Sequence, residues 1–195
     1  MSLERIHCAW APPSDELYRS YHDTEWGVPE YDSRALWEKL QLDGMQAGLA
    51  WITILRKRES IREEFEHFNP EKIARWTQPR IDKALQNPGI IRSPKKVQAI
   101  IGNAQAFLDA ADAGEGFADW CWSYVDGKPI KGEFDDYRNG PTKSAISDAL
   151  SKDLKRRGHK FVGPTIVYAW MQAVGMYNDH ELGCPARERV EALAR

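Results

Sequence analysis

The stretch KRRGHKFVGPT, residues Lys155–Thr165, decides the fold of this 195-residue chain. It runs from the basic end of one expected helix, through Gly158 and Gly163, into the apolar start of a second helix. Such a short turn can expose backbone N–H groups at a helix N-terminus, where a phosphate binds readily and nearby cations add attraction. The stretch therefore predicts either a helix-hairpin-helix element that binds DNA phosphates or a plain connection between two helices.

The segments on both sides of this turn have the periodicity of amphipathic helices. Apolar residues recur at intervals of three and four within Ser144–Arg157, and again between Gly163 and Gly175. The turn signal at Asp126–Lys128 lacks convincing strands on its flanks. We therefore expect an all-α fold, a bundle of about eight short helices, with residues 1–195 forming a single unit. Further expected helices are Ser33–Ala47, Trp51–Phe65 and Ser93–Ala113.

The composition excludes several classes of protein. With 27 basic and 29 acidic residues, the net charge is -2, so a nucleic acid or an anionic lipid can be bound only through a local patch. No apolar run approaches the roughly 20 residues that a membrane span needs, and Met1–Arg5 leads into polar sequence rather than a signal-peptide core. Three cysteines are too few, and odd in number, for a disulfide framework. We expect a monomeric cytoplasmic protein with no membrane partner.

A second basic glycine turn lies at Pro88–Lys96, which contains three cations and no acid. A third basic cluster is Arg56–Arg58. Either glycine turn alone is also compatible with a plain helix connection. Together, in a chain whose net charge is nearly zero, they indicate segregated charge, and a footprint for DNA phosphates is its natural use.

Cysteine and histidine residues near the two ends of the chain form a candidate metal site. Cys8 and His22 lie near the N-terminus, and His180 and Cys184 form a His-x3-Cys pair near the C-terminus. Two thiolates and two imidazoles suit a closed, tetrahedral structural zinc site. The alternative is that the cysteines are small core residues and the histidines are hydrogen-bonded surface residues. Cys121, between two tryptophans, is interpreted as a core residue.

One carboxylate lies where an apolar side chain is expected. Asp43 has helical spacing to Leu36 and Leu40, which places it on the apolar face of its helix. A buried ionised carboxylate is costly unless it is paired or used. Lys39, four residues earlier, is a candidate ion-pair partner; the alternative is that Asp43 forms the floor of a ligand pocket. Aromatic walls for such a pocket, or alternatively core residues, are available in Trp10, Tyr18, Tyr21, Trp26 and Trp51.

Six segments carry a resemblance to a known family. They are Cys8–Trp10, Tyr18–Pro29, Gln46–Thr53, Gly89–Arg92, Lys160–Gly163 and Asn178–His180. In these segments the chain closely resembles DNA-3-methyladenine glycosylase I, a bacterial family of zinc-containing alkylation-repair enzymes within the helix-hairpin-helix glycosylase superfamily. The similarity runs from about Ile6 to Cys184, and the ordered run Tyr-x-x-Tyr-His-Asp-x-Glu-Trp-Gly-Val-Pro is highly specific.

The resemblance implies an enzyme that flips N3-methyladenine out of alkylated double-stranded DNA and hydrolyses its glycosidic bond. No lysine lies in an evident Schiff-base position, so we expect no lyase step. The resemblance also implies one structural Zn²⁺, whose ligands are Cys8, His22, His180 and Cys184. The implied base-pocket residues are Trp10, Tyr18, Tyr21 and Trp51. The implied DNA-contacting residues are Gln46, Gly48, Leu49, Gly89, Ile91, Arg92, Lys95, Lys160 and Gly163.

The chain departs from the family at one important position. The family's pocket carboxylate is usually a glutamate before Gly-x-Gln-Ala-Gly-Leu, and this chain has Asp43 there. The charge is kept, but the reach is one methylene shorter, so the hydrogen bond to the flipped base becomes longer, bridged by water or absent. Two functions follow: a glycosylase with Asp43 as its catalytic residue, or a zinc-stabilised DNA-damage binding protein with weak or altered glycosylase activity.

Overall fold

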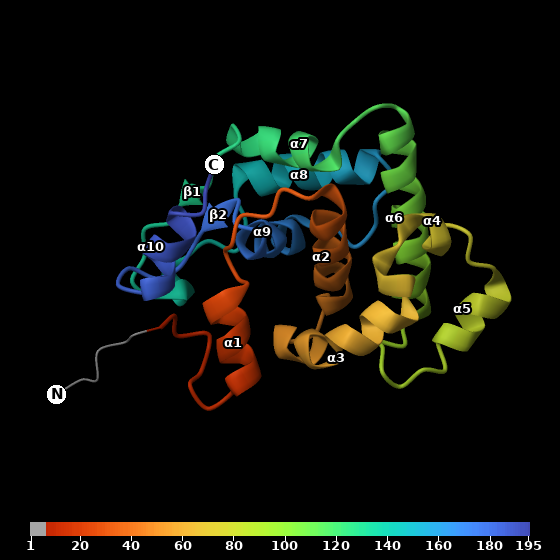
Figure 1. Cartoon of the computed structure of the whole chain (residues 1–195), viewed down its shortest axis with the longest axis horizontal. Helices are drawn as coiled ribbons and strands as arrows, with labels where there is room; N and C mark the ends of the chain where they lie inside the picture. The colour runs from red at the N-terminus through yellow and green to blue at the C-terminus, as the bar shows by residue number, and fades with distance from the viewer. Residues whose placement is uncertain (1–6) are drawn as a thin grey trace.

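The computed structural model describes residues 7–195, so the expectation for Met1–Arg5 concerns residues outside the described part of the chain. Within it are ten α-helices, three 3-10 helices and one two-stranded sheet (Figure 1). No helix in residues 7–195 combines the length and apolar character needed to cross a membrane. The first α-helices are α1 (Glu16–Thr24), α2 (Ser33–Gln46), α3 (Trp51–Glu64), α4 (Pro70–Ile73) and α5 (Gln78–Ala84). The others are α6 (Pro94–Asp112), α7 (Phe117–Trp122), α8 (Ala145–Arg156), α9 (Pro164–Ala173) and α10 (Pro185–Glu191).

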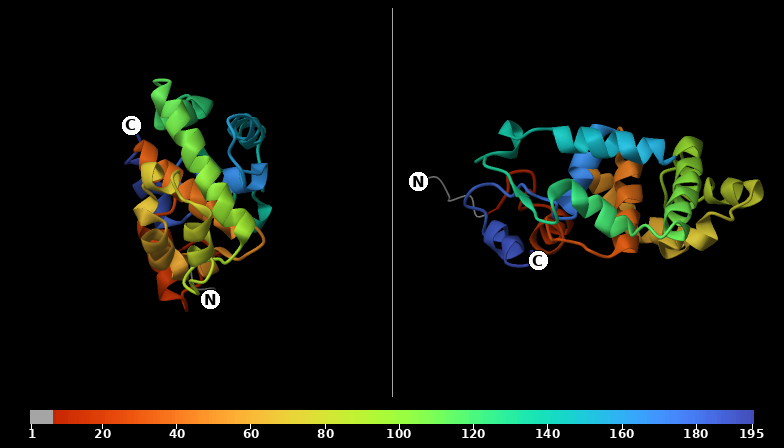
Figure 2. Two further views of the ribbon diagram at one scale, coloured as in Figure 1. Left: turned by 90° about the vertical axis from the view of Figure 1, so that its right-hand side faces the viewer. Right: turned by 90° about the horizontal axis from the view of Figure 1, so that it is seen from above.

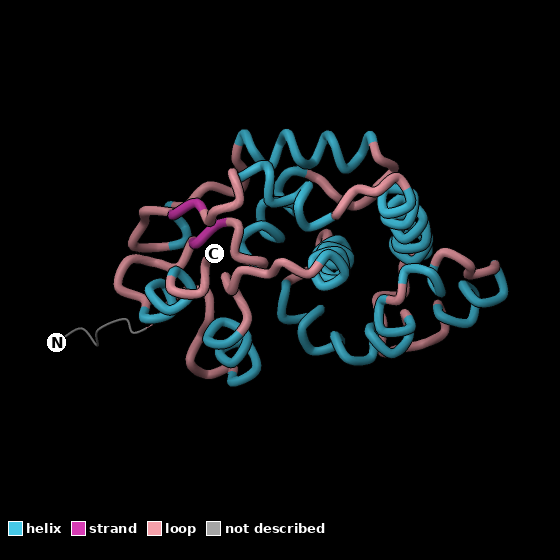
Figure 3. The backbone as a smooth tube through the Cα atoms, turned by 45° about the horizontal axis from the view of Figure 1, so that its top comes forward, coloured by secondary structure: helices cyan, strands magenta, loops and turns pink. Residues whose placement is uncertain are grey.

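The predicted all-α class is confirmed, although the expected number of helices was too small. The additional helices include α4, α5 and α10, which have four to seven residues each and are too short to show an apolar stripe. The 3-10 helices are η1 (Glu66–Phe68), η2 (Ser123–Val125) and η3 (Tyr137–Asn139). Two strands, β1 (Ile130–Lys131) and β2 (Tyr177–Asn178), pair in parallel and are magenta in Figure 3. At two residues each, they are too short to show an alternating pattern.

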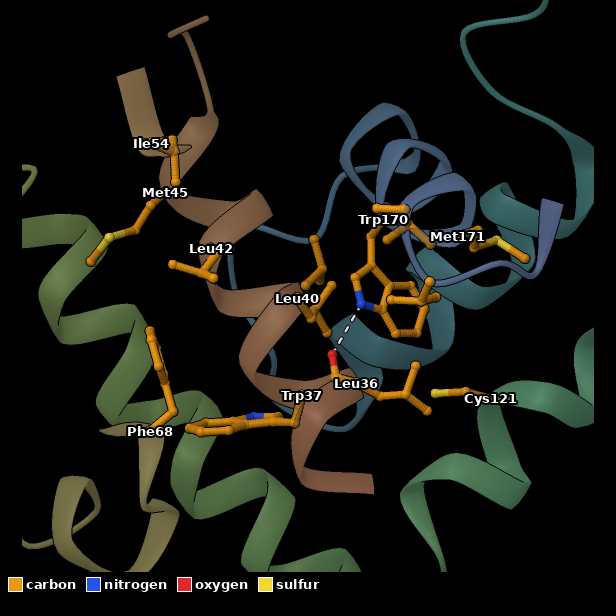
Figure 4. Close-up of a cluster of buried hydrophobic side chains, with 14 of the residues drawn as sticks. Leu36, Trp37, Leu40, Leu42, Met45, Ile54, Phe68, Cys121, Trp170 and Met171 are labelled. Carbon is orange, nitrogen blue, oxygen red and sulfur yellow. Dashed lines mark hydrogen bonds between the residues drawn. The ribbon is translucent and has the colours of Figure 1, made fainter. Parts of the chain in front are cut away.

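Helix α2 lies at the centre of the molecule and carries Asp43. Its N-cap is Asp32, whose side chain accepts a hydrogen bond from the Ala35 amide at 2.8 Å. Leu36, Trp37 and Leu40 are buried in the core cluster of Figure 4. The indole N–H of Trp170 on α9 donates to the Leu36 carbonyl at 3.0 Å. Because this bond and the core packing fix α2 between α9 and the other helices, the position of Asp43 is set by the core.

Residues 157–163, called here the α8–α9 turn, are held against α2 and α6. Asn103 on α6 accepts from the Lys160 amide at 2.8 Å and donates to the Lys160 carbonyl at 3.1 Å. The same Asn103 amide donates to the Gln41 side chain on α2 at 2.7 Å. Gly44 lies so close to the turn that a Cβ atom there would be 3.3 Å from the Phe161 carbonyl oxygen. The turn and the helix that bears Asp43 are therefore one packed unit.

The two ends of the described chain meet at one end of the molecule. Helices α1 and α10 and the short sheet lie there, while α4, α5 and α6 lie at the opposite end, as Figure 1 and the right-hand view of Figure 2 show. The Glu181 carboxylate accepts hydrogen bonds from the Ala9 amide at 3.1 Å. This contact joins the first described residues to the segment after β2.

Candidate functional site

A cavity of about 410 Å³ opens between α1, the C-terminal end of α2, the start of α3 and α9. This volume lies within the range of roughly 300–1,000 Å³ typical of small-molecule sites. All four predicted base-pocket residues line it, together with Asp43. The residues that line it from α1, α2, α3 and the segments flanking α1 are Trp10, Tyr18, Tyr21, Trp26, Asp43, Gln46 and Trp51.

The aromatic wall of the cavity is built from neighbouring rings on different elements. Tyr18 and Tyr21 are three residues apart on α1 and therefore share one face of that helix. Trp10 packs edge-on against Tyr18, with ring centroids 5.2 Å apart, and Tyr21 is tilted against Trp51 at 5.4 Å. The indole N–H groups of Trp10 and Trp51 are buried with no partner among the described residues. The wall thus offers aromatic rings to a ligand in the cavity.

Asp43 satisfies both alternatives that the sequence left open. It lines the cavity and is only 3% exposed, and its two carboxylate oxygens accept hydrogen bonds from Lys39 Nζ at 2.9 and 2.7 Å. Burial raises the pKa of Asp43, while the Lys39 charge and hydrogen bonds oppose that rise. Asp43 therefore forms the floor of the cavity and an ion pair with Lys39 at the same time.

The segment between α2 and α3 projects from the rim of the cavity. Gln46 lines the cavity itself, Gly48 has a φ of +77°, and the Leu49 side chain is 40% exposed. Lys96 on α6 donates from Nζ to the Met45 carbonyl at 2.8 Å and to the Ala47 carbonyl at 2.7 Å. Lys96 was not among the predicted site residues, since sequence spacing gives no sign of this long-range contact.

The two glycine turns differ in what their glycines do. Gly163 precedes α9, has an ordinary φ of -62°, and a Cβ atom there would meet nothing within 4 Å. A Cβ at Gly89 would instead lie 2.8 Å from Ser60 Cβ, and the Gly89 amide already donates to Asn87 Oδ1 at 2.7 Å. Internal packing thus accounts for Gly89 but not for Gly163.

The basic residues of these turns are unequally available to an outside partner. Arg92, Lys95 and Lys160 are exposed, and Ile91 is half-buried. In the third basic cluster, Arg56 pairs with Asp15 at 2.8 Å and Arg58 pairs with Glu25 at 2.5 Å. Lys57 donates to the Pro88 carbonyl at 2.6 Å. The cluster at 56–58 is therefore engaged mainly in internal contacts, unlike the exposed cations of the two turns.

Three of the four predicted metal ligands come together. The ligand atoms of Cys8, His22 and Cys184 all lie within 4.8 Å of one another, and all three residues are buried. Cys184 Sγ and His22 Nε2 are 3.6 Å apart, and His22 Nδ1 is hydrogen-bonded to Asp23 Oδ1 at 2.7 Å. A carboxylate on the outer nitrogen of a histidine is the usual support of a metal-binding imidazole. These residues could hold a metal ion.

His180, the fourth predicted ligand, lies beside this group but outside the compact set of three. Its ring centroid is 5.1 Å from that of His22, and its Nδ1 is 3.0 Å from Asn178 Oδ1. Its Nε2 is buried without a partner among the described residues. Gly27 allows the ring this position, since a Cβ there would be 2.6 Å from His180 Cε1.

The electrostatics of His180 and Cys184 suit metal ligation. Burial lowers the pKa of His180 to about 4, so the imidazole is neutral at physiological pH. The neighbouring Cys8 thiol, and then His22, favour the thiolate of Cys184 and lower its pKa. Neutral imidazole and thiolate are the protonation states that bind metal. Cys121 is buried in the core and outside the group, as predicted.

The far wall of the cavity was not predicted. Part of it comes from the segment before α8, namely Phe134, Tyr137, Arg138, Gly140, Pro141 and Thr142. Another part comes from α9 and the residues after β2, including Tyr168, Gln172 and Asp179. The Asp179 carboxylate accepts from the Tyr168 hydroxyl at 2.6 Å and from the Gln172 amide at 2.7 Å. Asp179 lies in the Asn178–His180 segment, which carries part of the family resemblance. No local sequence pattern marks the others, because only the tertiary fold brings them to the cavity.

Comparison with known proteins gives consistent matches along nearly the whole chain. The methyladenine glycosylase family model matches residues 10–188. The DNA-3-methyladenine glycosylase of Haemophilus influenzae is 49% identical over 180 residues, which cover 92% of this chain and 97% of that protein. DNA-3-methyladenine glycosylase 1 of Escherichia coli K12 is 50% identical over 177 residues, covering 91% of this chain and 94% of that protein.

Solved structures match equally well. A crystal structure of 3-methyladenine DNA glycosylase I superposes with a TM-score of 0.90 at 51% identity, covering 92% of this chain and 98% of that chain. The Staphylococcus aureus 3-methyladenine DNA glycosylase I, described in terms of its recognition of 3-methyladenine, superposes with a TM-score of 0.89 at 40% identity. That match covers 93% of this chain and 96% of the other.

Proposed function

The chain belongs to the methyladenine glycosylase family, and from this we propose that it is a DNA-3-methyladenine glycosylase, a hydrolase of N-glycosyl bonds in DNA repair. Its substrate is N3-methyladenine in alkylated double-stranded DNA. The observation that carries the proposal is the aromatic cavity with Asp43 at its floor, which suits a flipped cationic purine. Enzymes that act on a base in duplex DNA extrude it into such a pocket.

The aromatic walls supply the binding energy for the flipped base. Flipping costs a few kcal/mol, and stacking on an aromatic side chain contributes about 1–3 kcal/mol per base. N3-methylation makes the adenine cationic, so the π faces of Tyr21 and Trp51 attract it more strongly than a neutral base. A normal adenine, which lacks the charge, gains less and flips at a greater cost.

Asp43 is the proposed catalytic residue. The bond between C1′ and the purine nitrogen breaks, its electron pair neutralises the cationic base, and the sugar acquires oxocarbenium character. A buried carboxylate near this developing charge stabilises it more than it would in water. Water then adds to C1′ and releases one proton. Asp43 also accepts a hydrogen bond from the base, directly or through water, since the aspartate side chain is short.

The proposed reaction stops at base release. Lys39 Nζ lies within hydrogen-bonding distance of Asp43, as expected for the candidate ion-pair partner four residues earlier on the same helix. Lys39 lines a second cavity, however, and its ammonium is held by Asp43 and lies 4.0 Å from the Trp51 ring centroid. This position supports a monofunctional glycosylase, because a Schiff-base lysine must reach C1′ of the flipped nucleotide.

The DNA is proposed to bind across the exposed cations and the rim of the cavity. Leu49, with Gly48 beside it, enters the space left by the flipped base, while Gln46 faces the base. The α8–α9 turn acts as the helix-hairpin-helix element, in which the open approach to Gly163 allows a phosphate near the N-terminus of α9. Lys160 in the same α8–α9 turn supplies a further phosphate contact. Others come from the second turn, namely Gly89, Ile91, Arg92 and Lys95.

One structural Zn²⁺ is proposed at the cysteine and histidine group. Cys8, His22 and Cys184 supply three ligands, and the unpartnered Nε2 of His180 supplies the fourth. A set of two thiolates and two imidazoles fits tetrahedral zinc with no open position, so its contribution is to stability. The site would fasten the first described residues to the segment before α10.

The remaining proposals concern the domain organisation, the oligomeric state and the cellular compartment of the protein. The continuous hydrophobic core supports a single glycosylase unit. The buried free thiols of Cys8, Cys121 and Cys184 suit a reducing compartment such as the cytoplasm. A monomer stays the expected oligomeric state. A damage-binding protein without turnover is not favoured, because relatives at 49% and 50% identity carry the name of the enzyme.

The test is base release from alkylated duplex DNA by the purified protein, followed by chromatography. We expect free 3-methyladenine as the main product, with much less 3-methylguanine and 7-methylguanine, and no strand cleavage. Tight binding to the damaged duplex without free base would favour the damage-binding protein instead. Borohydride trapping of a protein–DNA adduct would show that a lyase step occurs.

A further inference from the structure

Lys39 has surroundings that the cleavage reaction described above does not explain. Its side chain is 17% exposed, and Nζ donates to both oxygens of Asp43, at 2.9 and 2.7 Å. The same Nζ lies 4.0 Å from the ring centroid of Trp51 and 5.9 Å from that of Tyr21. The ammonium therefore contacts the proposed catalytic carboxylate and two walls of the base cavity at once.

Lys39 reaches Asp43 from outside the base cavity. It lines a second cavity of about 460 Å³, whose wall includes Tyr21 but not Asp43 or Trp51. A carboxylate has about four lone-pair positions, so two hydrogen bonds from Lys39 leave acceptor capacity for a base in the first cavity. Asp43 can thus be held from one side and used from the other.

Few other charges lie close enough to replace Lys39 as the partner of Asp43. On the side of α1 and α3, Tyr21 faces the pair, and the neighbouring Glu25 and Arg58 bind each other at 2.5 and 3.0 Å. Across the base cavity, Tyr168 and Asp179 are hydrogen-bonded to each other, and neither is a cation. Arg138, which also lines this cavity, is bound to the Asp136 carboxylate, with its Nε 2.8 Å from Oδ1. Among residues 7–195, Lys39 is the cation that is hydrogen-bonded to Asp43.

We propose that Lys39 is a positioning residue for glycosidic-bond cleavage, whose ammonium holds the Asp43 carboxylate as an anion at the floor of the base cavity without entering that cavity. The proposal rests on the proposed glycosylase function and assigns a role to a residue that never touches the base. The Trp51 ring, which lies over the ammonium, keeps Lys39 in place through a cation–π contact.

Loss of this cation has a specific consequence. Burial already raises the pKa of Asp43, and Lys39 opposes the rise. Without the ammonium, the buried carboxyl takes up its proton at a higher pH, since an opposite charge within a few ångströms typically lowers the pKa of a carboxyl by about 1–3 units. The enzyme needs the anion, so the acidic limb of its pH profile should move upward by that amount.

The experiment compares kcat/KM for release of 3-methyladenine between about pH 5 and about pH 9 in the parent, Lys39→Met and Arg62→Met. Arg62→Met is the matched control, because Arg62 also lines the second cavity and pairs with Glu38 at 3.2 Å but contacts neither Asp43 nor Trp51. We expect the acidic limb of Lys39→Met to rise by about 1–3 pH units, with recovery toward the parent value at high pH. In Arg62→Met, the acidic limb of the kcat/KM profile should stay at the same pH as in the parent.

Two results would overturn the proposal. An acidic limb that stays at the parent's pH in Lys39→Met would show that Lys39 does not hold the anion. An equal loss of kcat/KM at every pH would show a purely structural role. A parent protein that releases no 3-methyladenine would contradict the proposed function itself, which is a separate result from either of these.

Discussion

The proposed chemistry depends on single side chains whose surroundings are unusual for their type. Asp43 is a carboxylate buried to 3% exposure, yet Lys39 balances its charge and an aromatic wall surrounds it. Trp51 lies against both the cavity and the Lys39 ammonium. The position of Asp43 on an apolar helix face was predictable from spacing. It was not predictable that Asp43 would both pair with Lys39 and line the cavity, because spacing does not reveal which side of a helix borders a cavity.

Replacement of Trp51 by alanine tests the role of stacking. The variant loses an aromatic wall worth about 1–3 kcal/mol, so we expect kcat/KM for release of 3-methyladenine to fall by roughly 5–150-fold. The control is Trp76→Ala, since Trp76 stacks on Phe65, away from the cavity. Rates are compared per folded molecule, as measured by circular dichroism. Equal losses in the two variants would contradict a stacking role for Trp51.

His159, in the α8–α9 turn, should make the stability of the folded chain depend on pH. Burial lowers its pKa from 6.5 to about 4, and both ring nitrogens lack partners among the described residues. The unfolded chain protonates this histidine below pH 6.5 while the folded chain resists, so stability is lost as the pH falls from 6.5 toward 4. That loss corresponds to about 3 kcal/mol.

The measurement is urea unfolding of the parent and His159→Phe at neutral pH and at about pH 4. The phenylalanine keeps the ring stacking with Phe117, whose centroid is 6.2 Å away, but has no site for a proton. We expect the unfolding free energy of the parent to drop by about 3 kcal/mol more than that of the variant. Equal drops would show that His159 is not held neutral in the fold.

At the scale of elements, the arrangement of α2, α6 and the α8–α9 turn positions the site. Asn103 joins all three through hydrogen bonds to Gln41 and to both backbone groups of Lys160. The long helices α2, α3, α6, α8 and α9 were predictable, because each shows a recurring apolar stripe. The shorter helices, such as α4 and α10, are fixed by tertiary contacts and by proline at their first turn, and they have too few residues to show a period.

Replacing each of the two turn glycines by alanine should affect a different property, DNA binding for Gly163 and stability for Gly89. Gly163→Ala meets no atom within 4 Å at an ordinary φ, so we expect a stability close to the parent's but weaker binding to duplex DNA, because the new methyl group occupies the approach of a phosphate. Gly89→Ala places its Cβ 2.8 Å from Ser60 Cβ and should lower the melting temperature. Thermal unfolding and fluorescence anisotropy with a labelled duplex measure both effects. Undiminished DNA binding by Gly163→Ala would contradict the assigned phosphate site.

At the scale of the whole molecule, distant parts of the chain meet twice. The group that could hold a metal ion joins Cys8 and His22 to the segment around Cys184, and the cavity combines α1 and α2 with α9 and the segment before α8. The first meeting was predictable from residue types that share one chemistry. The far wall of the cavity, with residues such as Phe134 and Tyr168, was not, since aromatic residues there are indistinguishable in sequence from core residues.

Metal removal tests the proposed zinc site. We expect about one zinc per chain by elemental analysis, and a lower melting temperature after chelation, by roughly 2–4 °C for each kcal/mol lost. Cys184→Ala should abolish zinc binding, whereas Cys121→Ala, which alters a buried cysteine outside the group, should keep it. A parent protein that contains no zinc, with a melting temperature indifferent to chelators, would contradict the site.

The central claim is that the Asp43 carboxylate in the aromatic cavity drives release of 3-methyladenine. Single-turnover release from methylated duplex DNA by the parent, Asp43→Asn and Asp43→Glu measures it most directly. Asp43→Asn keeps the shape but removes the charge, so we expect its rate to fall by about 100-fold or more, as when one preorganised electrostatic group is lost. Asp43→Glu, which keeps the charge, should retain activity. If Asp43→Asn released the base as fast as the parent, the account of the site would be wrong.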